Sequence, residues 1–230
     1  MNGRCADRRA IARRARRLAS VTAGLALALA GASAGCRESK PDRPPNIVLV
    51  VADTLRADHL GCYGYERPTS PHIDRFAREN LLFLQAVSAA PWTSPSVASL
   101  FTGLYPSAHG VLRAPVDDRR PTDALSPQLH TLAERLSGAG YTSIGITANP
   151  WVSRERGYAQ GFDAFVSRGH LDATSLSALA RTALEELRAR PTPFFLYLQY
   201  MDPHLPNEPP AELLDRFHPD GAARRAPANP

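Results

Sequence analysis

The chain has few cysteines, and their positions exclude a disulfide within its main body. It contains three cysteines in 230 residues, and two of them, Cys5 and Cys36, lie in the N-terminal segment. Only Cys62 remains in the rest of the chain, and a single cysteine cannot form an intrachain bridge. The fold must therefore be held by its core, and the length left is enough for one ordinary domain.

An apolar run long enough to span a membrane comfortably is also missing from the N-terminal segment. Residues 18–30 are apolar, but a spanning helix needs about 20 such residues. This run follows an arginine-rich head and precedes the small residues Ala34-Gly35-Cys36. The pattern predicts a secretory signal over residues 1–36.

The end of this signal resembles a bacterial lipobox, with Ser33 at the position usually held by leucine. The resemblance makes Cys36 the predicted lipidation site and implies a lipid anchor to the membrane. The alternative is an ordinary cleaved signal with an incidental cysteine. We expect an exported protein of the periplasm or cell envelope, with residues 37–45 as a polar tether.

An excess of basic charge is absent once the N-terminal segment is set aside. Residues 1–45 hold ten of the 27 basic residues and three of the 22 acidic ones, which leaves 17 basic against 19 acidic residues. The net charge of +5 is thus a property of the export signal. It does not favour nucleic acid as a partner. Residues 219–230 are rich in Ala, Arg and Pro and are predicted to be disordered.

Between these ends, apolar β-branched or aromatic runs alternate with segments of helical periodicity. This alternation predicts the α/β class, with a mostly parallel sheet flanked by helices. Strands are expected at residues 46–52, 82–87, 141–147 and 194–200, and helices at 71–83, 94–104, 125–138 and 172–190.

Candidate site residues follow these elements at particular places. Asp53 comes directly after the first strand, and Asp202-Pro203-His204 comes after the last one. Thr93 lies at the mouth of the helix predicted over 94–104. In parallel sheets the chemistry gathers at the carboxyl ends of the strands, and a helix start offers N–H groups to an anion.

Taken together, several segments resemble the sulfatase branch of the alkaline phosphatase superfamily. They occur in the family's order and cover roughly residues 46–210. The matching segments are 46–64 (NIVLVVADTLRADHLGCYG), 70–74 (SPHID), 93–106 (TSPSVASLFTGLYP), Gly140-Tyr141 and 200–204 (YMDPH).

The resemblance implies a metal-dependent hydrolase of sulfate or phosphate esters that acts on a small anionic substrate. Asp53 matches the first metal-binding aspartate. Thr93 matches the nucleophile, which true sulfatases build as formylglycine from Cys or Ser, and we expect it to contact the metal as well. His204 matches the active-site histidine that contacts the ester oxygens, which gives it a catalytic and substrate-binding role.

This sequence departs from the family pattern at several positions. Thr54 stands where sulfatases often have a second metal-binding aspartate, and Val97 replaces the arginine of the formylglycine motif, so no formylglycine is expected. The family's Gly-Lys-x-His segment is replaced by residues 147–150, where Asn149 is the polar residue that we expect to contact substrate. A threonine ester cannot expel sulfate by re-forming an aldehyde, which favours phosphate or phosphonate esters.

The family also supplies metal ligands from a later Asp-His or Asp-Asn pair, and no such motif follows His204. The chain is therefore expected to be the N-terminal part of a longer catalytic domain, over residues 46–218, and inactive alone. Its divalent metal would be calcium on the sulfatase pattern, or zinc, magnesium or manganese. Two alternatives stay open, namely a transferase of phosphoethanolamine or phosphoglycerol and a non-catalytic, anion-binding lipoprotein.

Overall fold

The computed structural model describes residues 43–113, 123–169, 171–206 and 209–217. The predicted signal with Cys36, most of the tether and the tail at 219–230 lie outside the described residues. The chain divides into the units Met1–Arg43 and Pro44–Pro230, and the second unit contains all the helices and strands described. Within the described ranges, no helix has the length and apolarity needed to cross a membrane.

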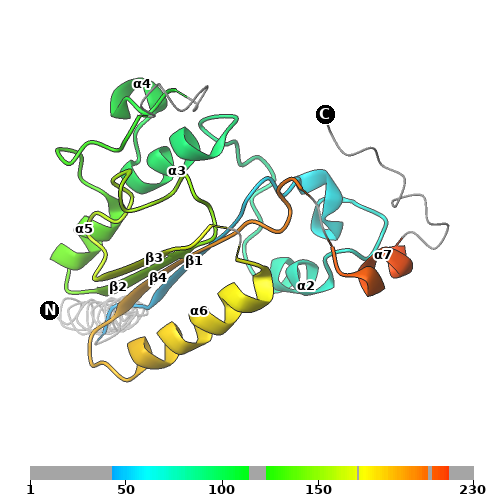
Figure 1. Cartoon of the computed structure of the whole chain (residues 1–230). Coiled ribbons are helices and arrows are strands. Elements are labelled where there is room, and N and C mark those ends of the chain that lie inside the picture. Colours follow the sequence, from blue (N-terminus) through cyan, green and yellow to red (C-terminus); the bar gives the residue numbers. More distant parts are fainter. Residues whose placement is uncertain (1–42, 114–122, 170, 207–208, 218–230) are drawn as a thin grey trace, which may run out of the picture. The chain divides into compact units, whose positions relative to one another are not determined.

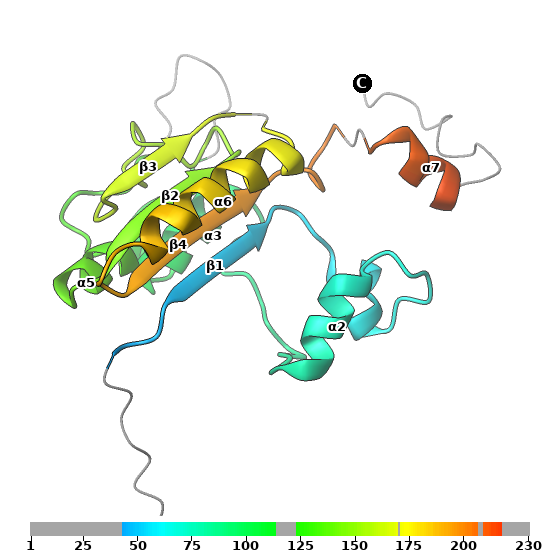
Figure 2. The same ribbon diagram turned by 90° about the horizontal axis from the view of Figure 1, so that it is seen from below.

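The centre of the second unit is a sheet of four parallel strands. They are β1 (Ile47–Ala52), β2 (Thr142–Thr147), β3 (Ala164–Ser167) and β4 (Phe194–Tyr200), in the spatial order β1-β4-β2-β3 (Figure 2). The prediction of a mostly parallel sheet is confirmed. In the register of β4, Gln199 pairs with Val51 on one side and Thr147 on the other.

Helices cover both faces of this sheet. The long helix α6 (Ala173–Arg188) lies on one face, and α3 (Thr93–Thr102) and α5 (Leu132–Gly138) lie on the opposite one (Figure 1). A hydrophobic cluster lies on each face of the sheet, and β4 contributes side chains to both. It does so because its successive side chains point to opposite faces. Phe195 and Tyr197 pack in the cluster that contains Phe101 of α3, whereas Phe194, Leu196 and Leu198 pack with α6.

This alternation decides which residues meet at the carboxyl edge of the sheet. Ile47, Leu49 and Val51 of β1 pack against the cluster on the α3 side. Asp53 lies two positions after Val51, so its side chain points to the same face as those of Ile47, Leu49 and Val51. Gln199 points to that face as well, because it follows Phe195 and Tyr197 at the same spacing. Both polar side chains are therefore directed to the face where α3 begins.

The strand predicted over residues 82–87 is wrong. These residues form no strand, and the apolar side chains Phe83, Leu84 and Val87 of this segment are 66–91% exposed. A strand is stable only with hydrogen-bonded neighbours, and β4 is the strand that pairs with β1 in the described sheet. A short apolar run alone does not supply that neighbour.

The helix predicted over 125–138 begins later, at Leu132. Thr131 caps it in a capping box, in which its hydroxyl accepts from the N–H of Glu134 and the Glu134 carboxylate accepts from the N–H of Thr131. This box gives the helix a defined start, so the preceding residues remain a loop. The helix predicted over 71–83 is likewise shorter, as α2 (Pro71–Glu79).

Several short elements were not predicted. Besides β3, they are the 3₁₀ helices η1 (Ala57–His59) and η2 (Gly61–Tyr63) and the helices α4 (Pro106–His109) and α7 (Ala211–Phe217). Their length explains the omission, because so few residues give too few turns for a periodic pattern to show.

Candidate active site

Asp53 lies at the carboxyl end of β1 and is buried, with 7% of its surface exposed. Its backbone N–H donates to the carbonyl oxygen of Tyr200 at 2.9 Å, which continues the pairing of β1 with β4 by one residue. Thr54 then takes a positive φ of 55°, a conformation rare for a β-branched residue. The chain thus turns sharply away from the sheet and leaves the Asp53 carboxylate at its edge.

Thr93 is the first residue of α3, with Trp92 in the extended N-cap position. Its hydroxyl does not cap the helix but lies 3.2 Å from Oδ2 and 3.3 Å from Oδ1 of Asp53. The two residues predicted to contact a metal are therefore neighbours, although 40 positions separate them in sequence.

Two amide side chains surround the same carboxylate. Asn149 donates from Nδ2 to Asp53 Oδ2 at 2.8 Å, and Gln199 donates from Nε2 to the same oxygen at 2.9 Å. Both amides are buried, with 1% and 0% of their surface exposed. A buried carboxylate is costly unless it is hydrogen-bonded, and these two donors satisfy Asp53 at the sheet edge.

Asn149 was predicted as a substrate contact, and the structure shows what holds its side chain. Its Oδ1 accepts from the N–H of Trp151 at 2.8 Å, and its Nδ2 also lies 3.2 Å from the sulfur of Met201. Together with Asp53, these partners satisfy the amide within the protein. The substrate-binding role stays a prediction, and the described contacts are with the carboxylate.

Gln199 was missed by the sequence analysis. The available signal was a polar amide in the otherwise apolar and aromatic run Phe194–Tyr200, at the end of a buried strand. Buried polar side chains require partners, so such a residue points to a polar cluster nearby.

His204 lies in the loop after β4, half-buried, with Nδ1 at 2.7 Å from the carbonyl oxygen of Leu205. The hydrogen bonds described around Asp53 do not include it. Asp202 of the same loop accepts at Oδ1 from the N–H of Ala173, the first residue of α6. Asp202 thus ties this loop to the start of α6, and the catalytic role of His204 stays a prediction.

Two buried side chains hold α3, Tyr158 at its first turn and His109 further along the helix. Tyr158 donates from its hydroxyl to the carbonyl oxygen of Ser94 at 2.7 Å. Burial raises the pKa of Tyr158 far above its ordinary value, so the hydroxyl keeps the proton that it donates. His109, at the end of α4, lies with Nε2 at 3.0 Å from the hydroxyl of Ser99.

The neighbours of His109 fix its tautomer. Its Nδ1 accepts from the N–H of Val111 at 3.1 Å, so Nε2 carries the proton and donates to Ser99. Burial lowers the pKa of His109 below its ordinary value of 6.5, against a hydrogen bond with the Pro95 carbonyl that raises it. A second proton would set an N–H at Nδ1 against the N–H of Val111.

We therefore expect acid to weaken the fold through His109. Because its folded pKa is lowered, the stability that it contributes is complete above the unfolded value of 6.5 and is lost as the pH falls through the folded value. Denaturant unfolding should show a smaller fall in the free energy of unfolding on acidification for His109→Gln than for wild type. Equal pH dependence in the two proteins would contradict this assignment.

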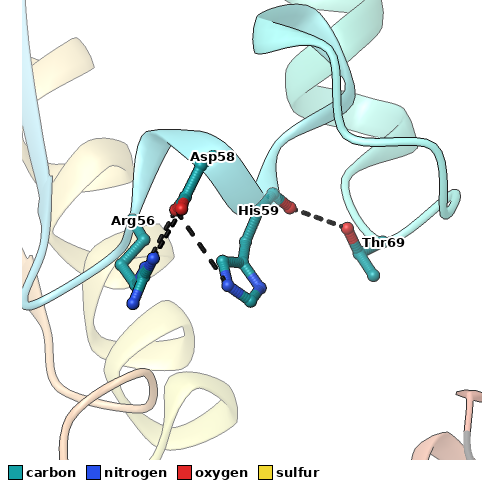
Figure 3. A network of polar contacts seen from close by, with 4 residues as sticks. All are labelled: Arg56, Asp58, His59 and Thr69. Carbon is teal, nitrogen blue, oxygen red and sulfur yellow. Dashed lines mark hydrogen bonds and ion pairs between the residues drawn. The ribbon is translucent and has the colours of Figure 1, made fainter.

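A surface ion cluster follows the turn after Asp53 (Figure 3). Arg56 donates from Nε to Asp58 Oδ1 at 2.9 Å, and His59 lies 4.0 Å from the same oxygen. The hydrogen bond with Arg56 lowers the pKa of Asp58, and the hydroxyl of Thr69 donates to the His59 carbonyl oxygen at 2.8 Å. Exposed pairs of this kind contribute little stability.

The donor chemistry at Asp53 and Thr93 fits a hard divalent cation. A carboxylate oxygen and a hydroxyl oxygen are ligands that Ca²⁺ and Mg²⁺ accept, but these ions take six or more oxygen ligands. Across the part of the chain that the structure describes, no group of three or more His, Cys, Asp or Glu side chains is placed to hold a metal. Among the described residues, Asp53 and Thr93 would therefore supply only part of such a coordination shell.

Comparison with known proteins identifies the family of this chain. A family model described as Sulfatase matches residues 45–226. The chain belongs to the sulfatase family. Steryl-sulfatase of Mus musculus is 37% identical over 134 residues, which cover 56% of this chain and 21% of that protein. The match thus spans about a fifth of the length of this curated sulfatase.

Solved structures agree on the fold of this sulfatase chain. The crystal structure of Ps i-CgsB in complex with k-i-k-neocarrahexaose has a TM-score of 0.62 at 24% identity, and covers 77% of this chain and 49% of its own. Phosphonate monoester hydrolase of Agrobacterium radiobacter has a TM-score of 0.56 at 20% identity, and covers 73% and 43%. These likenesses confirm the predicted sulfatase-type α/β fold.

Proposed function

We propose that this chain carries the nucleophile of a metal-dependent hydrolase that cleaves sulfate, phosphate or phosphonate esters. The observation that supports the proposal most directly is the 3.2 Å contact between the Thr93 hydroxyl and the Asp53 carboxylate. It joins the start of α3 to the carboxyl end of β1, where parallel sheets collect their chemistry. Membership of the sulfatase family supports ester hydrolysis. Our specific proposal is that Thr93 is the nucleophile of this reaction.

Thr93 would act as the nucleophile in two displacements. Its oxygen attacks sulfur or phosphorus, the bond to the ester oxygen breaks, and the alcohol leaves with a proton from solvent. Water then attacks the same centre, breaks its bond to Thr93 and restores the hydroxyl. The Asp53 carboxylate is the acceptor toward which the Thr93 proton is directed, and a divalent cation, when bound, favours the deprotonated hydroxyl.

The substrate would be held by the helix start and by the loop after β4. The first turn of an α-helix has N–H groups without intrahelical partners and a positive dipole end, which attract an anionic ester group. We propose that His204 contacts the ester oxygens of the substrate. Asn149, which donates a hydrogen bond to Asp53, would contact the same ester group. A threonine nucleophile favours phosphate and phosphonate esters, and a phosphonate monoester hydrolase among the fold neighbours is consistent with that preference.

The proposal is tested with the full-length protein and nitrophenyl esters of sulfate, phosphate and phosphonate. We expect nitrophenol release to fall to background after chelation and to return with calcium, or with zinc, magnesium or manganese. We also expect a phosphate diester or phosphonate to be cleaved faster than the sulfate. Release that is indifferent to chelation would overturn the metal-dependent mechanism, and a preference for sulfate would overturn the preference at phosphorus.

One observation favours a second candidate, a lipoprotein anchored through Cys36 that binds an anion without catalysis. Asp53 is the carboxylate that the described contacts place beside Thr93, and within the described ranges no cluster of three metal-ligating side chains occurs. A protein of this kind would bind sulfate or phosphate at the start of α3 without turnover of any ester. Anion binding together with inert nitrophenyl esters would favour this candidate over the hydrolase.

A further inference from the structure

The buried amide of Gln199 occupies a position at which the fold would otherwise place an apolar side chain. It is fully buried in β4, between Val51 of β1 and Thr147 of β2 in the strand register. A buried glutamine costs stability unless its oxygen and nitrogen both find partners. Its environment therefore has to account for both ends of the amide.

Each end of the amide has a defined partner. The oxygen Oε1 accepts from the hydroxyl of Tyr197 at 2.9 Å and from the hydroxyl of Thr147 at 3.1 Å. The nitrogen Nε2 donates to Asp53 Oδ2 at 2.9 Å, since an amide NH₂ group donates and a carboxylate oxygen accepts. The reverse orientation would set two oxygens against each other, so the NH₂ group must face Asp53.

The two oxygens of Asp53 consequently differ. Oδ2 receives the amides of Asn149 and Gln199 at 2.8 and 2.9 Å, in addition to the Thr93 hydroxyl at 3.2 Å. The described contact of Oδ1 is the longer one to Thr93, at 3.3 Å. Gln199 reaches Oδ2 from β4 and Asn149 reaches it from the loop after β2, so Oδ1 receives neither amide in the described contacts.

We infer that Gln199 is a positioning residue that, with Asn149, commits one oxygen of Asp53 to the protein and presents the other, Oδ1, to the cation and to Thr93. This inference rests on the proposed function. Gln199 acts through Asp53 and touches neither the substrate nor the reacting atoms. Partners that orient a metal ligand in this way are worth about 10- to 100-fold in metal affinity or activity.

The first test measures cation dependence in the full-length enzyme. Gln199→Met keeps the approximate volume but removes both ends of the amide. We expect this variant to need about 10- to 100-fold more of the activating metal chloride, with kcat recovered near saturation. Gln85→Met, in an exposed loop, is the matched control. A fall in kcat that extra metal does not restore would overturn a positioning role.

The second test needs neither activity nor metal. The side-chain NH₂ resonances of Gln199 and Asn149 are identified in the 230-residue chain by their loss in Gln199→Met and Asn149→Ala. We expect Asp53→Asn, which removes the charge but keeps an oxygen, to shift both resonances. An unmoved Gln199 resonance would overturn the inference even if the enzyme is active as proposed. Conversely, activity retained by Thr93→Ala would reject the proposed function. The resonance shifts in Asp53→Asn would still show whether Gln199 donates to Asp53.

Discussion

Thr93→Ala should lose nearly all of the ester hydrolysis of the full-length enzyme while folding as the wild type does. The substitution removes the oxygen that we propose as the nucleophile, and loss of a nucleophile typically lowers kcat by about a thousandfold or far more. The Thr93 hydroxyl is partly buried and contacts Asp53 rather than capping α3, so its removal leaves the helix start intact. The measurement is kcat on the best nitrophenyl ester, with circular dichroism to verify the fold.

Thr93→Ser is the control that separates the hydroxyl from the rest of the side chain. It keeps the oxygen beside Asp53 and removes one methyl group, so we expect it to retain a readily measurable part of the activity. In wild type, rapid quenching with a slow substrate should trap a sulfuryl or phosphoryl group on the peptide that contains Thr93. Turnover by Thr93→Ala at a rate near that of wild type would reject the covalent mechanism.

The outer strand β1 and the inner strand β4 were predictable because both are runs of apolar β-branched or aromatic residues, although Val48 and Val50 of β1 are half-exposed in the structure. β1 and β4 were both expected to within one residue, as IVLVVA and FFLYLQY. The segment 82–87 has a similar composition and was predicted as a strand on the same grounds. The difference lies in the partner, since β4 pairs with both β1 and β2 while residues 82–87 lie exposed. An apolar composition therefore indicates a possible strand but does not show whether that strand has a neighbour to pair with.

Site residues that belong to a sequence motif were predicted, whereas a site residue placed by the pairing of strands was not. Asp53 and Thr93 were found from their places at a strand end and a helix start, and the structure brings them together. Gln199 approaches Asp53 because β4 lies beside β1, although the two residues are 146 positions apart in sequence. Sequence alone does not fix that neighbour. Asn149 was found as a polar residue, but its partner depends on β2 lying on the other side of β4.

Asp53→Ala should abolish activity and also destabilise the metal-free protein, because Asp53 is the shared acceptor of a buried cluster. Its removal leaves the NH₂ groups of Asn149 and Gln199 without that acceptor, at a cost of about 1–3 kcal/mol for each buried donor that water does not reach. The free energy of unfolding, measured with denaturant in the presence of a chelator, should fall accordingly. The loss of stability comes from the unpaired amides, whereas the loss of activity comes from the missing carboxylate. The variant Asp53→Asn separates these two effects.

An asparagine at position 53 can turn its oxygen toward the two amides, and its NH₂ group then replaces Oδ1, which accepts neither amide and lies 3.3 Å from the Thr93 hydroxyl. We therefore expect Asp53→Asn to keep most of the stability that Asp53→Ala loses, yet to be as inactive, because an amide nitrogen neither ligates a hard cation nor accepts the Thr93 proton. Equal stability of the two variants would show that water can replace Asp53 as the acceptor. Activity in Asp53→Asn would mean that the charge at this position is dispensable, and the role assigned to Asp53 would then be wrong.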